Sequence, residues 1–394
     1  MNITTTLMQQ LEKDEGEMIA IRRHLHQHPE LSFQEKATAA YIKAYYEKLD
    51  CQITECGDGY GLIVDIIGEQ PGKRLALRAD FDALAVEEDN QLPFRSQVPG
   101  VMHACGHDGH TAYLMVLAKN LITLKDQLKG SIRIIHQPAE EVSPGGAKGM
   151  IADGCLTDID HVLGVHMMSS METGKIGYHS GETQTGRANF TLTIRGKGGH
   201  ASMPQLANDA IVAGSYFVTQ LQTIVSRRID PFDTASLTIG SFDGSGSFNA
   251  IKETVTLKGD VRVMKETTRQ TIHQQIQRMA DGLAQTFAVE TSLEYDDNYP
   301  VLYNDPAFTL QVIDSLKEAH LPEVKEIFDC GPQDPSEDFA YYAQERPSLF
   351  FYIGCMTEDH LNHPHHSPDF MMNEDCLLIA AKAVGTATIA YLMD

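Results

Sequence analysis

The sequence predicts an α/β protein in which a central mixed sheet flanked by helices is interrupted by an inserted βαββαβ domain of the ferredoxin-like type. Short β-branched runs alternate with helical segments in the first half of the chain, and the same texture returns after Pro300. Between about Arg187 and about Asp296 the order becomes strand, helix, two strands, helix, strand, which is typical of a split βαβ module. At 394 residues the chain is long enough for two domains.

The expected domains are therefore residues 1–186, 187–296 and 297–394, of which the first and last form one domain split by the second. No internal repeat or low-complexity tract marks another boundary.

The composition excludes several classes of function. There are 31 Lys and Arg residues against 54 Asp and Glu, which gives a formal net charge of -23 and disfavours binding to nucleic acid or anionic membrane. Residues 1–18 resemble neither a signal peptide nor an anchor, and no apolar run of eighteen residues is expected to span a membrane. Seven scattered cysteines without a C-x-x-C pair argue against a disulfide framework. We therefore expect a cytoplasmic protein.

The first segment is expected to open with two helices. Ser32 followed by Glu35 has the pattern of a capping box, and residues 33–49 continue with helical spacing.

Strands are expected next, at residues 61–67 and 74–79. The second run ends in R-A-D-F-D, which places Arg78, Asp80 and Asp82 at the mouth of a strand. Because ligands bind at the carboxyl ends of strands in open α/β sheets, these side chains are candidates for a functional site.

The densest cluster of potential ligands is H-A-C-G-H-D-G-H, from His103 to His110, which leads into an apolar run at residues 113–124. Thiolate, imidazole and carboxylate side by side suit a borderline divalent cation such as zinc, and the glycines allow a tight fold around it. The alternative is a polar loop that caps a helix, with Asp108 as the N-cap and solvated histidines.

Two further strands are expected to end in potential ligands. Residues 131–136 lead into Q-P-A-E-E, which contains Glu140 and Glu141, and residues 160–165 end at His166. Solvated strand ends are the alternative, but three such strands favour one site at the edge of the sheet.

The inserted domain is expected to contain six elements: strand 188–195, helix 209–228, strands 235–242 and 253–263, helix 266–287 and strand 289–295. The last segment is expected to contain helix 305–320, a short helix with Ser336 as its N-cap, strand 348–354 and helix 373–393. A second histidine cluster, N-H-P-H-H-S-P at residues 362–368, lies between the last strand and the last helix. We expect the fold to bring both histidine clusters to one site.

The candidate metal ligands are Cys105, His107, Glu141, His166 and one histidine of the late cluster. Five side chains exceed what one zinc ion needs, so two ions that share a bridging group fit better. Such a pair makes a hydroxide nucleophile available at neutral pH, which indicates a hydrolytic site.

Glu140 is the candidate general base. Neighbouring residues in an extended chain point to opposite sides, so Glu140 should not bind the same ion as Glu141. It is then free to take the proton of the attacking water and to pass it to a leaving amine.

Seven motifs, which occur in order around the βαββαβ insertion, carry a family resemblance: R-A-D-F-D-A-L, H-A-C-G-H-D-G-H, Q-P-A-E-E, G-V-H, G-G-H-A-S-M-P, S-E-D-F and H-H-S-P. From about Ile21 to the last helix, the chain resembles the metal-dependent aminoacylase and carboxypeptidase superfamily. More narrowly it resembles the amidohydrolase branch with hippurate hydrolases, N-acetyl-diaminopimelate deacetylases and indoleacetyl-amino-acid hydrolases. Assignment to this branch depends mainly on Cys105, because many relatives have an aspartate at the bridging position.

The resemblance implies a catalytic domain with two divalent metal ions per subunit, of which zinc is the expected metal and manganese, cobalt or nickel are alternatives. It implies the ligands Cys105, His107, Glu141, His166 and His366, with Glu140 as general base. His366 is chosen because it directly precedes Ser367 and Pro368, whereas His363 and His365 are expected at the surface or behind the ligands. Asp80 is expected to orient an imidazole ligand through its other ring nitrogen.

The resemblance also implies roles for the inserted domain as a lid or dimerisation domain. His200 would reach the active site of a neighbouring subunit in a homodimer or higher oligomer and stabilise the oxyanion. Asn249 and Arg262 would bind polar groups of the substrate, although Arg262 could instead be a structural ion-pair partner. A lid that closes over its own active site is the alternative to a dimer.

The implied reaction is cleavage of the amide bond of an N-acyl amino acid or small peptide by metal-activated water. A metallo-aminopeptidase or dipeptidase, acting also on longer peptides, is one alternative. A thiol hydrolase with Cys105 as nucleophile and His107 as base is another. A non-catalytic metal-binding homologue is the third, although it would be expected to lose Glu140.

Overall fold

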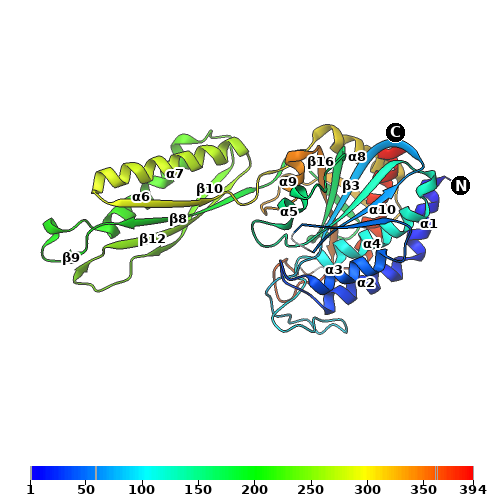
Figure 1. Cartoon of the computed structure of the whole chain (residues 1–394), viewed down its shortest axis with the longest axis horizontal. Coiled ribbons are helices and arrows are strands. Elements are labelled where there is room, and N and C mark those ends of the chain that lie inside the picture. Colours follow the sequence, from blue (N-terminus) through cyan, green and yellow to red (C-terminus); the bar gives the residue numbers. More distant parts are fainter. Residues whose placement is uncertain (1, 58–59, 360, 362, 394) are drawn as a thin grey trace. The chain divides into compact units, whose positions relative to one another are not determined.

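The computed structural model describes residues 2–57, 60–359, 361 and 363–393. Asn362, the first residue of the second histidine cluster, lies outside the described residues. The chain forms two compact units (Figure 1): the first comprises Met1–Gly181, Tyr303–Gly331 and Asp338–Asp394, and the second comprises Glu182–Leu302 and Pro332–Glu337.

The first unit contains an eight-stranded mixed sheet, which confirms the predicted fold class. The strand order is β1-β2-β4-β3-β5-β16-β6-β15. Strand β3 pairs in parallel with both β4 and β5, and β16 pairs in parallel with β5, so these four strands end at the same edge. The strands are β1 (Gln52–Cys56), β2 (Gly61–Ile67), β3 (Gln70–Asp80), β4 (Lys129–Gln137), β5 (His161–Glu172), β6 (Lys175–Tyr178), β15 (Glu326–Asp329) and β16 (Ser348–Met356).

The helices of this unit cover the sheet and contribute many of the apolar side chains of the unit's core. They are α1 (Ile3–Lys13), α2 (Glu15–Gln27), α3 (Lys36–Tyr46), α4 (His107–Thr123), α5 (Gly146–Ala152), α8 (Pro306–Ala319), α9 (Ala340–Glu345) and α10 (Asp375–Met393). Helix α4 packs against β3, β4 and β5 and is buried along almost its whole length. It therefore fixes the H-A-C-G-H-D-G-H segment, at its N-terminus, to the edge where those strands end.

The prediction of two opening helices with a capping box is wrong. Three helices open the chain, and α3 begins only at Lys36. The Ser32 hydroxyl donates instead to Asp82 (2.7 Å), and the Glu35 carboxylate accepts from the Ala139 amide (2.8 Å). Both side chains are thus used to hold strand-end loops, which a local sequence pattern does not reveal.

Helix α10 corrects the expectation that no long apolar run occurs. An 18-residue window of this 19-residue helix has a mean hydropathy of 1.7, enough by length and composition to cross a membrane, but 89% of the window is buried inside the protein. Lys382 within it forms ion pairs with Glu12 and Glu323. Such burial is typical of a core helix of a large domain.

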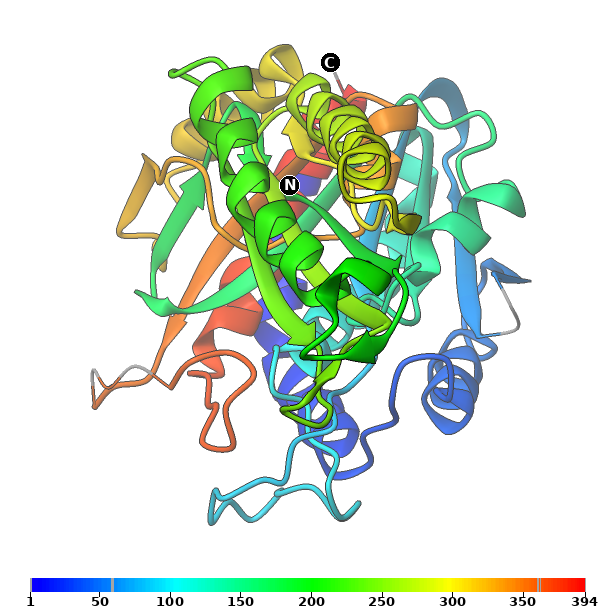
Figure 2. The ribbon, with the colours of Figure 1, turned by 90° about the vertical axis from the view of Figure 1, so that its left-hand side faces the viewer.

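The second unit has the predicted βαββαβ order. An antiparallel sheet in the order β10-β12-β8-β13 is covered on one face by two helices, which Figure 2 shows side by side in front of their strands. The elements are β8 (Gly186–Arg195), α6 (Ala210–Arg228), β10 (Ala235–Asp243), β12 (Thr254–Val263), α7 (Glu266–Phe287) and β13 (Glu290–Asp296), with a short pair β9 (Gly199–His200) and β11 (Ala250–Ile251). Two short strands, β7 (Gly181–Gln184) and β14 (Leu302–Asn304), lie where the chain passes between the units.

The expected N-cap role of Ser336 is also wrong. Helix α9 begins four residues later, with Phe339 at its N-cap. The Ser336 hydroxyl instead accepts a hydrogen bond from Arg262 (3.3 Å) in the second unit.

Candidate metal centre

Four chain segments bring the five candidate ligands together in the first unit. Cys105 precedes α4 and His107 is its first residue, Glu141 follows β4, and His166 lies within β5. His366 lies in the loop between β16 and α10, and its amide donates to the Ala104 carbonyl (2.8 Å). This bond attaches the late histidine cluster to the first one, as the sequence predicted.

The five side chains fall into two groups that share one member. Cys105, His107 and His166 have their ligand atoms within 4.8 Å of one another, and so do Cys105, Glu141 and His366. The shared member is the cysteine, whose sulfur can bridge two cations. This is the arrangement that two ions with one bridging group require.

Glu140 and Glu141 both reach this place, so the argument that their side chains diverge is wrong. Their carboxylates and the His107 imidazole lie within 4.8 Å of one another. The chain is not extended here, because Ala139 has a positive φ of 53°. The Glu140 side chain is buried, with only 6% of it exposed. This suits a base that acts beside the metal ligands.

The His107 ring is oriented by Asp82. Its Nδ1 donates to the Asp82 carboxylate and to the Asp82 carbonyl, both at 3.1 Å. The same carboxylate accepts from the Glu141 amide (3.0 Å). One buried side chain therefore positions two candidate ligands.

The remaining polar atoms of these ligands fit a cation. Buried His107 Nε2 has no hydrogen-bond partner among the described residues and lies 3.8 Å from Glu141 Oε1, which in turn lies 3.3 Å from His366 Nε2. Burial lowers the pKa of His107, but Asp80, Asp82 and Glu141 outweigh it and raise that pKa to about 10. The negative charge of these carboxylates thus favours a protonated His107 ring when no metal is bound. A divalent ion would neutralise the same charge more fully.

His166 and Cys105 also have the chemistry of ligands. His166 Nδ1 donates to the Met167 carbonyl (2.8 Å), so its Nε2, 3.5 Å from the Cys105 sulfur, keeps its lone pair. Burial, aided by His110, holds the pKa of His166 well below its usual value. Burial, followed by Glu141 and Glu140, raises the pKa of the Cys105 thiol well above its usual value. A cysteine in such surroundings is a poor nucleophile unless a cation offsets the carboxylates.

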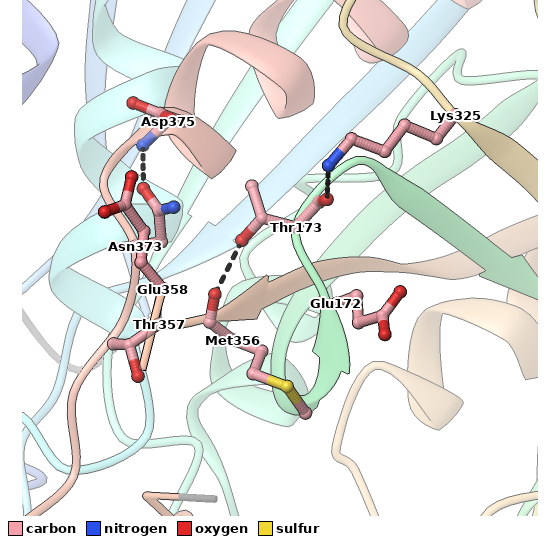
Figure 3. A pocket seen from close by; sticks show the side chains of 8 residues that line it. All are labelled: Glu172, Thr173, Lys325, Met356, Thr357, Glu358, Asn373 and Asp375. Carbon is pink, nitrogen blue, oxygen red and sulfur yellow. Dashed lines mark hydrogen bonds between the residues drawn. The ribbon is translucent and has the colours of Figure 1, made fainter. Parts of the chain in front are cut away.

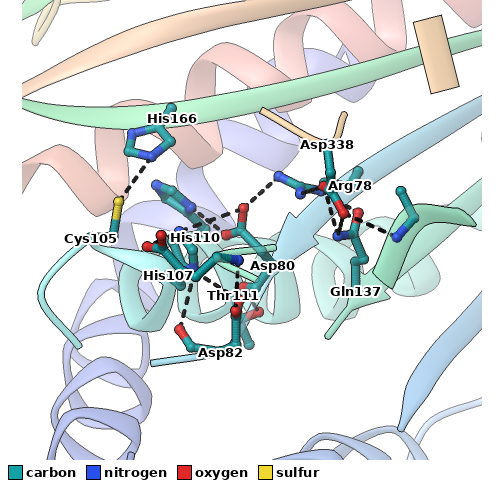
Figure 4. Close-up of polar contacts among 12 residues, drawn as sticks. Arg78, Asp80, Asp82, Cys105, His107, His110, Thr111, Gln137, His166 and Asp338 are labelled. Atoms are coloured by element: carbon teal, nitrogen blue, oxygen red, sulfur yellow. Dashed lines mark hydrogen bonds and ion pairs between the residues drawn. The ribbon is translucent and has the colours of Figure 1, made fainter. Parts of the chain in front are cut away.

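Asp80 lies beside His107, with one carboxylate oxygen 3.9 Å from His107 Nε2. It accepts from His110 Nδ1 (2.6 Å) and pairs with Arg78, as Figure 4 shows. The Met167 amide donates to His110 Nε2 (3.0 Å), so His110 has both ring nitrogens engaged. Arg78 also pairs with Asp338 (2.8 Å). Asp82 therefore makes the closer contact to the His107 ring, while Asp80 orients His110, and the role of Asp80 beside the metal stays a prediction.

Asp108 does not cap a solvated loop, which was the alternative interpretation of its segment. Gly106, with a φ of 90°, is the N-cap of α4, and Asp108 is buried inside the first turn. Its carboxylate pairs with Arg22 (2.9 Å) and His26 (2.8 Å) from α2. These contacts fix the start of α4, and with it His107.

The sequence did not predict three sets of contacts: those of Asp82 with His107, of Arg78 with Asp338, and of Asp108 with Arg22 and His26. The only sequence signal was the second carboxylate of R-A-D-F-D. Late in the chain, His365 is partly buried with its ring against that of His166, at 5.3 Å between centroids. His363 is buried beside Asp359 (3.4 Å) and Asp369 (3.6 Å). Neither belongs to the two ligand groups.

The predicted residues of the inserted domain lie in the second unit. His200 is exposed in β9, opposite Ala250 of β11, and the Ser202 amide and hydroxyl donate to its Nδ1. Its Nε2 therefore carries the hydrogen and can donate. Asn249 adjoins this pair, and its carbonyl accepts from the Ala201 amide (3.1 Å). Arg262 pairs with Asp260 (3.0 Å).

A separate hollow of about 310 Å³ in the first unit contains none of the candidate ligands. Figure 3 shows Lys325 and Glu172 on one side of it and Glu358 and Asp375 on the other, and Lys325 Nζ donates to the Thr173 carbonyl (3.1 Å). The residues that line it are Glu172, Thr173, Lys325, Met356, Thr357, Glu358, Asn373 and Asp375.

Replacing Asp82 by alanine should weaken metal binding without removing a ligand. Loss of its contacts to His107 and Glu141 frees both ligands, and we expect metal affinity to fall by about 10- to 100-fold. Titration against a competing chelator measures this. Ser32→Ala removes only the hydroxyl that donates to Asp82, so its affinity should stay within about threefold. Equal metal affinity in Asp82→Ala and the unsubstituted protein would contradict the positioning role.

Comparisons with known proteins identify the relatives of this chain. The model of the peptidase family M20/M25/M40 matches residues 76–389. An N-acyl-L-amino acid amidohydrolase of Geobacillus stearothermophilus is 41% identical over 290 residues, which cover 73% of this chain and 78% of the relative.

Two solved structures extend over nearly the whole chain. A protein of methicillin-resistant Staphylococcus aureus is 55% identical with a TM-score of 0.96, over 99% of this chain and all (100%) of the other. A dinuclear metal-binding peptidase of the M20 family from Bacillus subtilis is 29% identical with a TM-score of 0.84, over 97% of this chain and 99% of the other.

Proposed function

The chain belongs to the peptidase family M20/M25/M40 and is a metal-dependent hydrolase of carbon–nitrogen bonds, and we propose that it removes the acyl group from N-acyl amino acids. The observation that carries this proposal is the pair of ligand groups that share Cys105, with the buried carboxylate of Glu140 beside them. The Geobacillus stearothermophilus relative, an N-acyl-L-amino acid amidohydrolase, supports the substrate class. Zinc is the proposed metal, with manganese, cobalt or nickel as alternatives.

Different residues of the chain hold the metal ions, transfer the proton and position the ligands. Two divalent ions held by the ligand groups would supply a Lewis acid for the amide carbonyl and lower the pKa of water. Glu140 removes the proton from the attacking water and delivers it to the departing amine nitrogen. Asp82 holds the His107 ring and the Glu141 backbone in place while this happens.

The second unit supplies the groups that recognise the rest of the substrate. His200 Nε2 donates to the developing oxyanion, while Asn249 and Arg262 bind polar groups of the amino acid. We propose that His200 acts in a partner subunit of a homodimer. Support comes from apolar side chains exposed on and beside α6, which an interface would bury: Met203, Leu206, Ile211, Val212 and Tyr216.

A substrate screen tests the proposed function. Metal-free protein refilled with each divalent metal is assayed on N-acetyl and N-benzoyl amino acids, on dipeptides and on longer peptides. We expect hydrolysis of the N-acyl amino acids, no activity without metal, and highest activity with zinc. Hydrolysis of dipeptides or longer peptides alone would overturn the proposed substrate class in favour of a peptidase.

One contact favours a second candidate function. The Cys105 sulfur lies 3.5 Å from His166 Nε2, a distance at which the imidazole could act as base for a thiol nucleophile. The high pKa of the buried thiol disfavours this reaction. Activity that survives complete removal of metal would select the thiol mechanism.

Mixed dimers test whether His200 acts across subunits. His200→Ala and Glu140→Ala should each give a nearly inactive protein. After subunit exchange between equal amounts, about half of the dimers are mixed and each has one whole site, so about a quarter of the unsubstituted activity should return. Activity is measured before and after exchange that is verified by mass. No recovery after verified exchange would show that His200 does not act in a partner.

A further inference from the structure

The Glu35 carboxylate is bound to the backbone next to the candidate base. Glu35 immediately precedes α3, but its side chain does not cap that helix. Its Oε1 accepts instead from the amide of Ala139 (2.8 Å), the residue before Glu140. The Glu35 side chain is fully buried, so this bond is shielded from water. A contact across 104 positions of sequence thus reaches the loop of residues 138–145, between β4 and α5.

Ala139 has a strained conformation that its hydrogen bonds hold in place. Its φ of 53° lies in the left-handed region, which residues other than glycine adopt only when their surroundings enforce it. Both of its backbone polar groups are engaged: the amide donates to Glu35, and the carbonyl accepts from the Gly146 amide (2.9 Å). Of these two bonds, the one to Glu35 is made by a side chain, so a substitution can remove it.

The conformation of Ala139 determines where the next two side chains lie. In an extended chain Glu140 and Glu141 would project to opposite sides, yet both carboxylates lie within 4.8 Å of the His107 imidazole. The Glu141 amide is held separately, by Asp82 (3.0 Å). The base and the adjacent ligand are therefore anchored through two different buried carboxylates.

We propose that Glu35 is a positioning residue for the general base. Its bond to Ala139 keeps that residue in the left-handed conformation and so keeps Glu140 beside the metal ligands. The proposal rests on the proposed function, in which Glu140 transfers the proton, and deepens it. Glu35 belongs to neither ligand group, and a small displacement of a catalytic group is enough to slow a reaction. The effect of losing Glu35 should therefore fall on kcat.

Two substitutions of Glu35 separate the contact from the charge. Burial, followed by the charge of Asp82, raises the pKa of Glu35 to about 7, so a neutral carboxyl that still accepts from Ala139 is populated near neutral pH. Glu35→Gln keeps such an oxygen, and its kcat should stay within about threefold. Glu35→Ala removes it, and kcat should fall at least about tenfold with KM within about twofold. Steady-state kinetics on an N-acetyl amino acid, at full metal occupancy, measure both.

A second substitution distinguishes positioning from a general loss of structure. Glycine adopts a positive φ without steric cost, so Ala139→Gly should partly compensate for the missing carboxylate. The double variant Glu35→Ala/Ala139→Gly should regain at least about threefold in kcat over Glu35→Ala. The control is Glu30→Ala. Glu30 accepts from the Ala37 and Thr38 amides of α3 (3.1 and 2.8 Å) and not from the loop, so its loss should leave kcat within about twofold.

Hydrogen exchange tests the same contact without any substrate. Peptides that cover residues 138–145 should exchange at least about tenfold faster in Glu35→Ala, and at nearly the unsubstituted rate in Glu35→Gln. Unchanged exchange in Glu35→Ala, unchanged kcat in that variant, or equal losses of kcat in the alanine and glutamine variants would each overturn the proposal. If the unsubstituted protein hydrolyses no N-acyl amino acid, the proposed function fails, and the exchange rates still decide whether Glu35 holds the loop.

Discussion

Glu140→Gln should retain both metal ions and lose at least about a hundredfold in kcat, the range expected for a positioned general base. The amide has the size of the carboxylate but no basicity, and the candidate ligands remain in place. Glu140 is 6% exposed and its carboxylate lies within 4.8 Å of His107 and Glu141, so a solvent base has little room to replace it. Steady-state kinetics on an N-acetyl amino acid, with metal content measured on the same sample, provide the test.

The control for this variant is Glu55→Gln. Glu55 is an exposed glutamate of β1 that pairs with Lys43 (2.7 Å), and its replacement should leave kcat within about twofold because exposed ion pairs contribute little. Near-normal turnover of Glu140→Gln at full metal occupancy would show that another group is the base.

Cys105→Ala should lose both metal ions, whereas His166→Ala and His366→Ala should each affect mainly one. Cys105 is the member common to the two ligand groups, while each histidine belongs to one of them. We expect the cysteine variant to bind metal at least about a hundredfold more weakly and to lose activity in proportion, because a missing ligand costs more than a missing outer contact.

Metal content by elemental analysis after dialysis, and chelator competition, measure this. Cys355, a buried cysteine of β16 outside both ligand groups, offers the control Cys355→Ala, which should keep two ions. Two tightly bound ions in Cys105→Ala would rule out a shared sulfur.

The candidate ligands that the structure brings together are visible in the sequence because their signal is local. A metal site is indicated by three histidines, a cysteine and an aspartate within eight residues, and by two adjacent glutamates after a strand. These motifs can be identified without knowledge of the tertiary structure. The βαββαβ order is likewise visible as periodicity. The order of the strands is not, because β4 pairs between β2 and β3 through contacts that are distant in sequence.

The errors arise where tertiary contacts override a local pattern. Ser32 has the spacing of a cap, but its hydroxyl donates to Asp82 fifty positions away in sequence. Asp80 and Asp82 are equivalent in R-A-D-F-D, and only the strand geometry turns one toward His110 and the other toward His107. The positive φ of Ala139 brings two adjacent glutamates to one place, which a strand-like alternation excludes.

Anomalous diffraction from crystals of the metal-loaded protein tests the central claim most directly. The two ligand groups predict two anomalous peaks per chain, one among Cys105, His107 and His166 and the other among Cys105, Glu141 and His366. Two such ions should lie about 3.5 to 4 Å apart, with the cysteine sulfur between them. A single peak, or two peaks of which only one contacts Cys105, would contradict a dinuclear centre bridged by this cysteine.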